Sequence, residues 1–180
     1  MSEYFSGEKQ SLEDILEARD IRVDYQQYLI NKYGSTIVSY KLNIPGAVKY
    51  NPLVKNIFDE GLRAFKQKLG ELLIDIVHEK ILYKNSGPEY FAVFYEKDKL
   101  IKKIAADIEE IHPLGRLYDF DVLDASGNQV SRRDLGLQPR KCLICKSNAF
   151  ECGRSRKHEV SELIEKIEEM AIDYFKNIKL

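Results

Sequence analysis

The chain has 180 residues, of which 44% are hydrophobic and 32% are charged, and its formal net charge is −1. These values are typical of a globular protein, and we expect a single domain over residues 1–180. No window approaches the ~20 apolar residues needed to span a bilayer. The opening MSEYFSGEKQSLED also lacks the apolar centre of a signal peptide. We therefore expect a cytoplasmic protein without a membrane partner.

Two helices and a strand are predicted for the first part of the chain. A capping-box pattern at Ser11 predicts the start of a helix that ends at Gly34. The stretch TIVSYKLNI, residues 36–44, is typical of a strand. Residues 51–69 follow as a helix, because their opening Asn-Pro pair is typical of a first helical turn.

The middle of the chain predicts three more strands and a helix. Residues 72–84 and 90–97 are predicted as strands joined by the turn NSGPE, although the first segment is also compatible with a helix. Residues 97–111 have helical periodicity, and residues 117–123 follow as a strand.

The resulting order is β-α-β-β-α-β, and an amphipathic helix from about Glu159 ends the chain. We therefore predict an α+β fold, in which a βαββαβ-like antiparallel or mixed sheet has helices on one face. Extra helices are added at the N-terminal and C-terminal ends.

The stretch HPLGRLYDFDVLD places two aspartates one residue apart in a strand. Because side chains alternate along a strand, Tyr118, Phe120 and Val122 point to one face, and Asp119 and Asp121 point to the other. Two close carboxylates repel each other unless they are well solvated or bind a cation. Carboxylates, phosphates and water are the ligands that Mg²⁺ prefers. We expect the aspartate pair to hold Mg²⁺; a solvated edge strand is the alternative.

Residues around this pair are candidates for binding phosphate. Gly115 and Arg116 precede the strand, where a glycine lets the backbone approach a ligand and a guanidinium can bind phosphate. Arg132 and Arg133 follow the turn ASGN, and a hairpin over residues 123–130 would bring them beside the aspartates. We expect these four residues to bind substrate; surface pairing of the two later arginines with local acids is the alternative.

The cysteines are a separate candidate site. Cys142, Cys145, Cys152 and His158 follow the spacing C-x2-C-x6-C-x5-H, which fits a tetrahedral structural Zn²⁺ site. An odd number of clustered cysteines does not match a secreted disulfide framework. Small cysteines also pack as ordinary buried hydrophobes, and both interpretations stay open.

A basic segment surrounds these cysteines. Between Ser131 and His158 there are eight Lys or Arg and two acids, a net charge of +6, whereas the rest of the chain carries −7. Concentrated positive charge attracts an anionic partner and speeds its association. A solvated surface without a partner is the alternative.

Several segments resemble one known family. HPLGRLYDFDV, SRRDLGLQPRKCLICKSNAFECGRSRKH, SGPE and ARDIR are similar to the citrate lyase holo-acyl-carrier-protein synthases, which are phosphoribosyl-dephospho-CoA transferases. The resemblance extends from about Leu12 into the last helix. Tyr118 stands where a tryptophan is expected in that family. Because an aromatic residue is kept, we interpret the difference as a change in packing.

The resemblance implies a nucleotidyltransferase-type domain and a defined reaction. The family transfers a 5-phosphoribosyl-dephospho-CoA group from its triphosphate precursor, triphosphoribosyl-dephospho-CoA, to a serine of the citrate lyase acyl carrier (gamma) subunit and releases pyrophosphate. Asp119 and Asp121 would then bind Mg²⁺, or one of them would accept the serine proton. His112 is a further candidate base, and a structural role at the helix end is its alternative.

The acidic character of acyl carrier proteins gives the basic segment a partner. The residues that we expect to dock the carrier are Arg140, Lys141, Arg154, Arg156 and Lys157. A nucleic-acid-binding zinc module is a rival interpretation, but Phe150 is the single aromatic residue of the segment, so we expect no nucleic-acid partner. A non-enzymatic carrier adaptor is a second rival, in which the aspartate pair would have no role.

Overall fold

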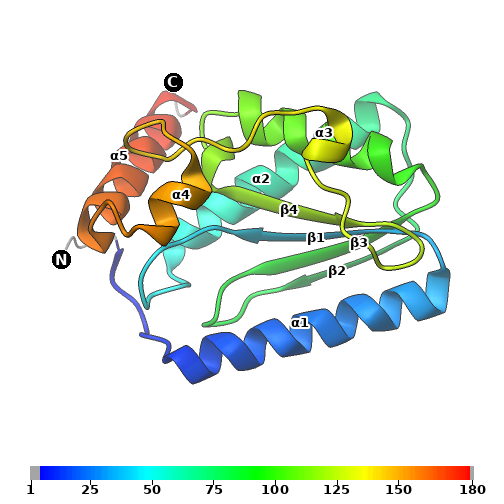
Figure 1. Cartoon of the computed structure of the whole chain (residues 1–180), viewed down its shortest axis with the longest axis horizontal. Helices are drawn as coiled ribbons and strands as arrows, with labels where there is room; N and C mark the ends of the chain where they lie inside the picture. The colour runs from blue at the N-terminus through cyan, green and yellow to red at the C-terminus, as the bar shows by residue number, and fades with distance from the viewer. Residues whose placement is uncertain (1–4, 179–180) are drawn as a thin grey trace.

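The computed structural model describes residues 5–178, which form four strands and five α-helices (Figure 1). In chain order these are α1 (Leu12–Tyr33), β1 (Thr36–Leu42), α2 (Pro52–Glu71), β2 (His78–Leu82), β3 (Glu89–Phe94), α3 (Asp98–Ile111), β4 (Tyr118–Leu123), α4 (Ala149–Arg154) and α5 (Val160–Ile178). The predicted β-α-β-β-α-β order, with helices added at both ends, is confirmed. Within residues 5–178, no helix has the length and apolar composition needed to cross a membrane.

The four strands form one sheet in the order β2-β3-β1-β4. Every pairing in it is antiparallel, which selects one of the two sheet types predicted. The register places Lys41 of β1 between Glu89 of β3 and Asp119 of β4. Because β4 has a neighbour on one side only, its other edge is open to the loop segments that follow it.

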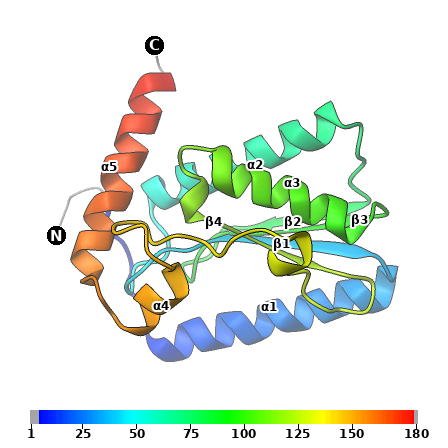
Figure 2. The same cartoon turned by 45° about the horizontal axis from the view of Figure 1, so that its top comes forward.

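Helices cover both faces of the sheet. α2 and α3 lie on one face, and α1 runs along the other (Figures 1 and 2). The main core lies under α2 and α3, where Tyr40 stacks between Phe58 and Phe120 at ring-centroid distances of 4.8 and 4.1 Å. The prediction of helices on one face is confirmed for the two crossover helices, and the added N-terminal helix covers the opposite face.

The second face has a smaller apolar contact with α1. Leu29 and Ile30, near the end of the helix, pack against Ile37, Phe91 and Leu123 of the sheet. The earlier turns of α1 lie beside the other end of β1, where the sheet residues on this face are polar. This end of the layer contains a cavity rather than a packed core.

The capping residues predicted from the sequence lie at the ends of α1 and α2. The Ser11 hydroxyl accepts a hydrogen bond from the Asp14 backbone N–H at 3.1 Å, which completes the capping box of α1. Gly34 ends that helix with a φ of 53°, a conformation that glycine adopts without a steric penalty. The Asn51 side chain accepts from the backbone N–H of Val54 at 2.8 Å and caps α2.

One predicted strand is shorter than expected. Residues 72–77 belong neither to a strand nor to a helix, and β2 begins at His78. The Ile74 backbone N–H donates to the Leu69 carbonyl at 3.0 Å, and Leu73 takes a left-handed φ of 55°. The first residues of the predicted strand therefore close the end of α2.

The predicted hairpin after β4 is confirmed. Leu123 and Gln129 form an isolated antiparallel bridge. The Asp124 carboxylate accepts hydrogen bonds from the backbone N–H groups of Ser126 and Asn128, each at 2.8 Å. After this turn, residues 131–140 run back along the open edge of β4.

Candidate functional site

The aspartate pair lies on the face of β4 opposite the main core. Tyr118 and Phe120 are buried, whereas the Asp119 and Asp121 side chains keep 33% and 26% of their surface exposed. The alternation predicted for this strand is confirmed. The carboxylates therefore face the layer that contains α1.

Lys41 neutralises the pair from the neighbouring strand. Its ammonium group donates a short hydrogen bond to Asp119 Oδ2 and a second one to Asp121 Oδ2 at 3.1 Å. Burial disfavours the charge on Lys41, but the two carboxylates outweigh this effect and raise the pKa of the lysine. Lys41 is therefore a cation at this site, and it was not among the residues selected from the sequence.

The remaining carboxylate oxygens also accept hydrogen bonds. Arg140 Nη1 lies 3.4 Å from Asp119 Oδ1, and Gln129 Nε2 donates to Asp121 Oδ1 at 2.5 Å. Burial opposes ionisation of Asp119, but the positive charges of Lys41 and Arg140 outweigh it and hold the pKa of Asp119 below its usual range. Asp119 is thus an ionised group between two cations.

In the structure, the cation that contacts both Asp119 and Asp121 is the Lys41 ammonium group. The Lys41 ammonium occupies the space between the carboxylates that a shared ion would need. Within residues 5–178, no histidine, cysteine or other carboxylate joins the pair in a metal-binding group. Binding of Mg²⁺ at this pair stays a prediction.

A first cavity, which we call the helix-side cavity, lies between α1, the end of β1 and the loop before β3. Its volume is about 220 Å³. Its charged lining residues are Arg19, Arg22, Lys41, Lys49, Glu89 and Asp119. Four cations and two acids give the helix-side cavity a net positive charge, which favours an anionic ligand.

Some charged residues of the helix-side cavity have a partner of opposite charge, and others have none. Glu89 is buried and is already neutralised by Arg22 at 2.7 Å and Lys84 at 3.0 Å. Arg19 and Lys49 have no carboxylate partner within the described residues. Burial lowers the pKa of Lys49, so its ammonium group gains from an anion beside it.

Two segments quoted for the family resemblance meet at the helix-side cavity. ARDIR supplies Arg19 and Arg22 from α1, and SGPE supplies Ser86 and Gly87 from the loop before β3. Gly87 has a φ of 116°, which other residues rarely adopt. The four basic residues of this cavity were missed as site residues, although the ARDIR segment contained the signal for two of them.

A second cavity of about 550 Å³, which we call the edge cavity, follows the open edge of β4. Its charged lining residues are Lys102, Glu109, Asp119, Asp121, Arg132, Arg133 and Arg140. The hairpin therefore brings Arg132 and Arg133 beside the aspartates, as predicted. Arg132 is already paired, with Glu109 at 3.1 Å and with Glu110 through a short contact, whereas Arg133 is exposed.

Arg140 lies elsewhere than predicted. The sequence interpretation placed it away from the aspartate pair, and this placement is wrong, because Arg140 contacts Asp119. Its predicted role in docking the carrier stays a prediction. Its guanidinium donates to the backbone carbonyls of Tyr118 at 2.6 Å and Arg116 at 3.1 Å, and it contacts Asp119. Extended chain without regular structure carries Arg140 back to β4.

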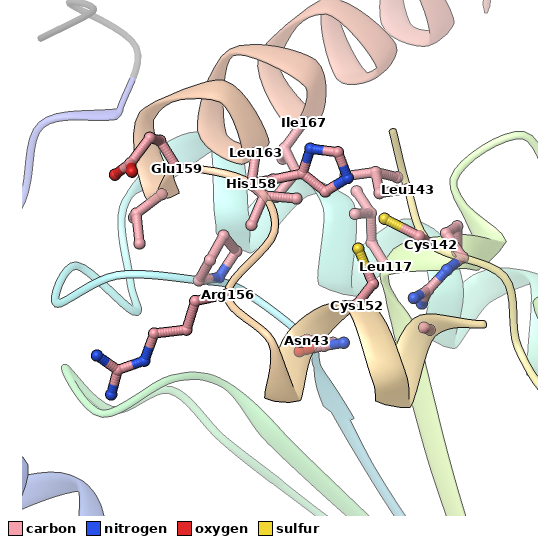
Figure 3. A pocket seen from close by; sticks show the side chains of 15 residues that line it. Asn43, Leu117, Cys142, Leu143, Cys152, Arg156, His158, Glu159, Leu163 and Ile167 are labelled. Carbon is pink, nitrogen blue, oxygen red and sulfur yellow. The ribbon is translucent and has the colours of Figure 1, made fainter. Parts of the chain in front are cut away.

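Gly115 and Arg116 have mainly structural contacts. A β-carbon on Gly115 would lie 2.5 Å from the carbonyl oxygen of Ile108, so glycine is needed for close packing on α3. Arg116 Nε donates a short hydrogen bond to the carbonyl of Lys141. The Arg116 side chain lines a third cavity, of about 600 Å³, beside α5 (Figure 3). Phosphate binding by these two residues stays a prediction.

His112 lies on the core side of β4, away from the aspartate pair. Its ring nitrogens contact the hydroxyls of Tyr118 at 3.0 Å and Tyr174 at 3.1 Å, and Glu60 at 3.3 Å. Burial lowers its pKa, although Glu60 opposes the shift. His112 lines neither cavity that Asp119 borders, and this placement favours its structural interpretation.

The other predicted docking residues are exposed. Lys141, Arg154, Arg156 and Lys157 lie at the surface around α4, and Figure 3 shows the Arg156 guanidinium pointing away from the third cavity. Their role in docking stays a prediction. The structure also brings together Cys142, Cys145, Cys152 and His158, whose donor atoms all lie within 4.8 Å of one another.

Comparison with known proteins identifies the family. The family described as apo-citrate lyase phosphoribosyl-dephospho-CoA transferase matches residues 10–174. A probable apo-citrate lyase phosphoribosyl-dephospho-CoA transferase of Vibrio cholerae serotype O1 is 38% identical over 165 residues, which cover 91% of this chain and 93% of that protein. Protein CitXG of Haemophilus influenzae is 39% identical over 92% of this chain and 36% of its own length. The apo-citrate lyase phosphoribosyl-dephospho-CoA transferase of Escherichia coli O1:K1 is 31% identical over 96% of this chain and 94% of its own. The family predicted from the sequence motifs is confirmed, and the chain belongs to the apo-citrate lyase phosphoribosyl-dephospho-CoA transferases.

Proposed function

We propose that this chain transfers the 5-phosphoribosyl-dephospho-CoA group of triphosphoribosyl-dephospho-CoA to a serine of the citrate lyase acyl carrier (gamma) subunit. Pyrophosphate is released and the carrier becomes its holo form. Family membership supports this assignment. We further propose that the reaction takes place in the cytoplasm.

The observation that carries the proposal is that Asp119 lines both the helix-side cavity and the edge cavity. A transfer reaction must bring two substrates to one point. One cavity is small and basic, and the other is an open groove along a strand edge. Asp119 and its partner Lys41 are therefore the place where the two substrates meet.

The helix-side cavity is suited to the triphosphate. Arg19 and Lys49 have positive charges without a carboxylate partner in the described residues, and Lys41 supplies a third cation next to Asp119. Cations held in place before the reaction stabilise negative charge that develops on a leaving pyrophosphate. This arrangement gives the triphosphate precursor an anion site on the α1 side of the sheet.

The chemistry follows from this placement. The serine hydroxyl oxygen of the carrier forms a bond to the α-phosphorus, and the bond from that phosphorus to the oxygen bridging to the β-phosphate breaks. The serine proton passes to one carboxylate of the pair, Asp119 or Asp121. Pyrophosphate leaves with the electron pair of the broken bond, and a phosphodiester joins the carrier to the prosthetic group.

Mg²⁺ has a limited place in this proposal. Bound with the triphosphate, the ion would neutralise phosphate charge. The Lys41 ammonium group contacts both carboxylates of the pair. The cations of this chain perform the charge stabilisation described above.

The edge cavity is the proposed approach for the carrier. It is open along β4 and has Arg133 exposed at its rim. The exposed residues Lys141, Arg154, Arg156 and Lys157 extend this positive surface toward α4. Opposite potentials on the two proteins would speed their encounter without a large interface.

Intact-mass analysis of the carrier tests the proposal. Apo carrier subunit is incubated with the chain, triphosphoribosyl-dephospho-CoA and Mg²⁺, and we expect the mass to increase by one 5-phosphoribosyl-dephospho-CoA group. A carrier with its acceptor serine changed to alanine serves as the control and should keep its mass. Binding of the carrier without any gain in mass would favour the adaptor interpretation and contradict the proposal.

A further inference from the structure

The geometry points to a structural zinc ion held by Cys142, Cys145, Cys152 and His158, which fastens the segment carrying Arg140 against β4. The four donor atoms lie within 4.8 Å of one another, although they come from a turn, a helix and the loop that follows it. Such a donor set is typical of closed zinc sites. The site is separate from the aspartate pair, and its existence does not depend on the transfer activity.

The sulfur spacing is that of separate thiols and is compatible with a zinc ion. Cys145 Sγ and Cys152 Sγ lie 3.7 Å apart, and all three cysteines are free thiols. With Zn–S bonds of about 2.3 Å, tetrahedral geometry sets neighbouring sulfurs about 3.8 Å apart. A disulfide would bring them to about 2.0 Å. The observed distance matches two corners of a zinc tetrahedron.

The histidine adds an independent observation. His158 Nε2 is buried and has no hydrogen-bond partner. Figure 3 shows its ring directed toward the sulfur atoms of Cys142 and Cys152. The other ring nitrogen, Nδ1, lies 4.0 Å from a carboxylate oxygen of Glu162. A metal-binding histidine commonly has one nitrogen on the ion and donates its other N–H to a carboxylate. Glu162 lies on the corresponding side of His158, at a distance longer than a hydrogen bond.

Backbone contacts hold the cysteines close to one another. Lys141 and Asn148 form an antiparallel bridge, and the Cys142 N–H donates to the Ser147 carbonyl at 2.6 Å. This tight turn sets Cys145 beside Cys142. The Asn148 side chain then caps α4, which presents Cys152.

The surrounding charge also suits this site. Three thiolates and one Zn²⁺ carry a net charge of −1. The segment from Ser131 to His158 has a net charge of +6 when its thiols are counted as neutral. A site with a net charge of −1 is therefore balanced by the positive charge of the segment in which it lies.

The proposed ion has a structural link to the aspartate pair. Arg140 and Lys141 directly precede Cys142, and the Arg140 carbonyl accepts from the Ala149 N–H at 2.8 Å. The Arg116 side chain holds the Lys141 carbonyl. An ion that holds this turn in place therefore also holds the Arg140 guanidinium near Asp119. The position of Arg140 at the aspartate pair then depends on the zinc ion.

Metal analysis of the purified chain tests the site. Protein prepared without chelators should contain about one zinc per chain. Exchange for Co²⁺ should give the absorption bands of a tetrahedral thiolate complex. Cys145→Ser and His158→Ala should lose most of the bound metal, whereas His78→Ala, on β2, is the matched control and should keep it.

Chelation of the wild-type chain tests the structural role without any variant. Removal of zinc should lower the Tm by roughly 5–10 °C, because binding free energy is then part of folding free energy. Hydrogen exchange should increase in residues 139–149 and stay unchanged in β3. Wild-type protein that contains no zinc and takes up no Co²⁺, or that forms a disulfide within this group, would overturn the site. Unchanged exchange in residues 139–149 after metal removal would overturn its anchoring role.

Discussion

Lys41 and Asp119 face each other across the β1–β4 pairing, and the Lys41 ammonium also reaches Asp121 at 3.1 Å. This contact replaces the expected repulsion between two neighbouring carboxylates with a cation from the adjacent strand. It also places that cation at the boundary of the helix-side cavity. The charge states of Asp119, Asp121 and Lys41 therefore depend on one another.

Replacing Lys41 should impair the reaction. Lys41→Met removes the charge that outweighs burial at Asp119, so the pKa of Asp119 should rise and the triphosphate should lose a cation. We expect kcat/KM for transfer to fall about 10²-fold. Lys68→Met, which changes an exposed lysine of α2 paired with Glu71, is the matched control and should remain near wild type. Equal activity of the two variants would show that Lys41 has no role in transfer.

The aspartate pair can be tested for metal and for proton transfer together. If Asp119 and Asp121 bind Mg²⁺, titration calorimetry of the protein with Mg²⁺ alone should show binding, and the double change to Asn should abolish it. Each single change to Asn should lower transfer by orders of magnitude. The variant that also removes the acidic limb of the pH–rate profile identifies the base. Near-normal rates in both single variants would contradict the assignment.

His112 should affect stability rather than proton transfer. Burial lowers its pKa from the ordinary 6.5, so the folded state favours the neutral ring. The stability that it contributes is fully present above pH 6.5 and is lost as the pH falls toward the folded-state pKa. His112→Asn should therefore lower the free energy of unfolding by about 1–3 kcal/mol at pH 7, with a smaller difference at lower pH. A pH–rate profile that loses a limb in this variant would instead support His112 as the base.

The exposed basic residues should act on the encounter with the carrier. Changing Arg154, Arg156 and Lys157 to Glu should raise the carrier concentration for half-maximal rate and weaken its dependence on salt. Affinity for triphosphoribosyl-dephospho-CoA should stay near wild type. The same charge change at Lys32, Lys66 and Lys68 is the control. Loss of precursor binding in the first variant would place its residues in the nucleotide site.

Periodicity and spacing predicted those parts of the structure that depend on neighbouring residues. The alternation in YDFDV placed Asp119 and Asp121 on one face, because the side-chain period of a strand is fixed. The turn ASGN predicted the hairpin that brings Arg132 and Arg133 back. The cysteine spacing predicted a group that the fold brings together.

Contacts between distant segments were not predictable in the same way. Lys41 and Asp119 are 78 positions apart, and their contact depends on a strand register that no local pattern specifies. The position of Arg140 depends on the path of a segment with little regular structure. The helix-side cavity requires α1 to lie on the second face of the sheet, and the order of elements left that face undetermined.

The most direct test of the proposed transfer is the amount of pyrophosphate released for each carrier modified. Carrier mass and pyrophosphate are measured in the same reaction, with wild-type chain, Lys68→Met and Asp119→Asn in parallel. We expect one pyrophosphate per carrier modified for the wild type and for Lys68→Met, and neither product in significant amount for Asp119→Asn. Modification of the carrier without matching pyrophosphate, or full activity of Asp119→Asn, would contradict transfer at the meeting point of the two cavities.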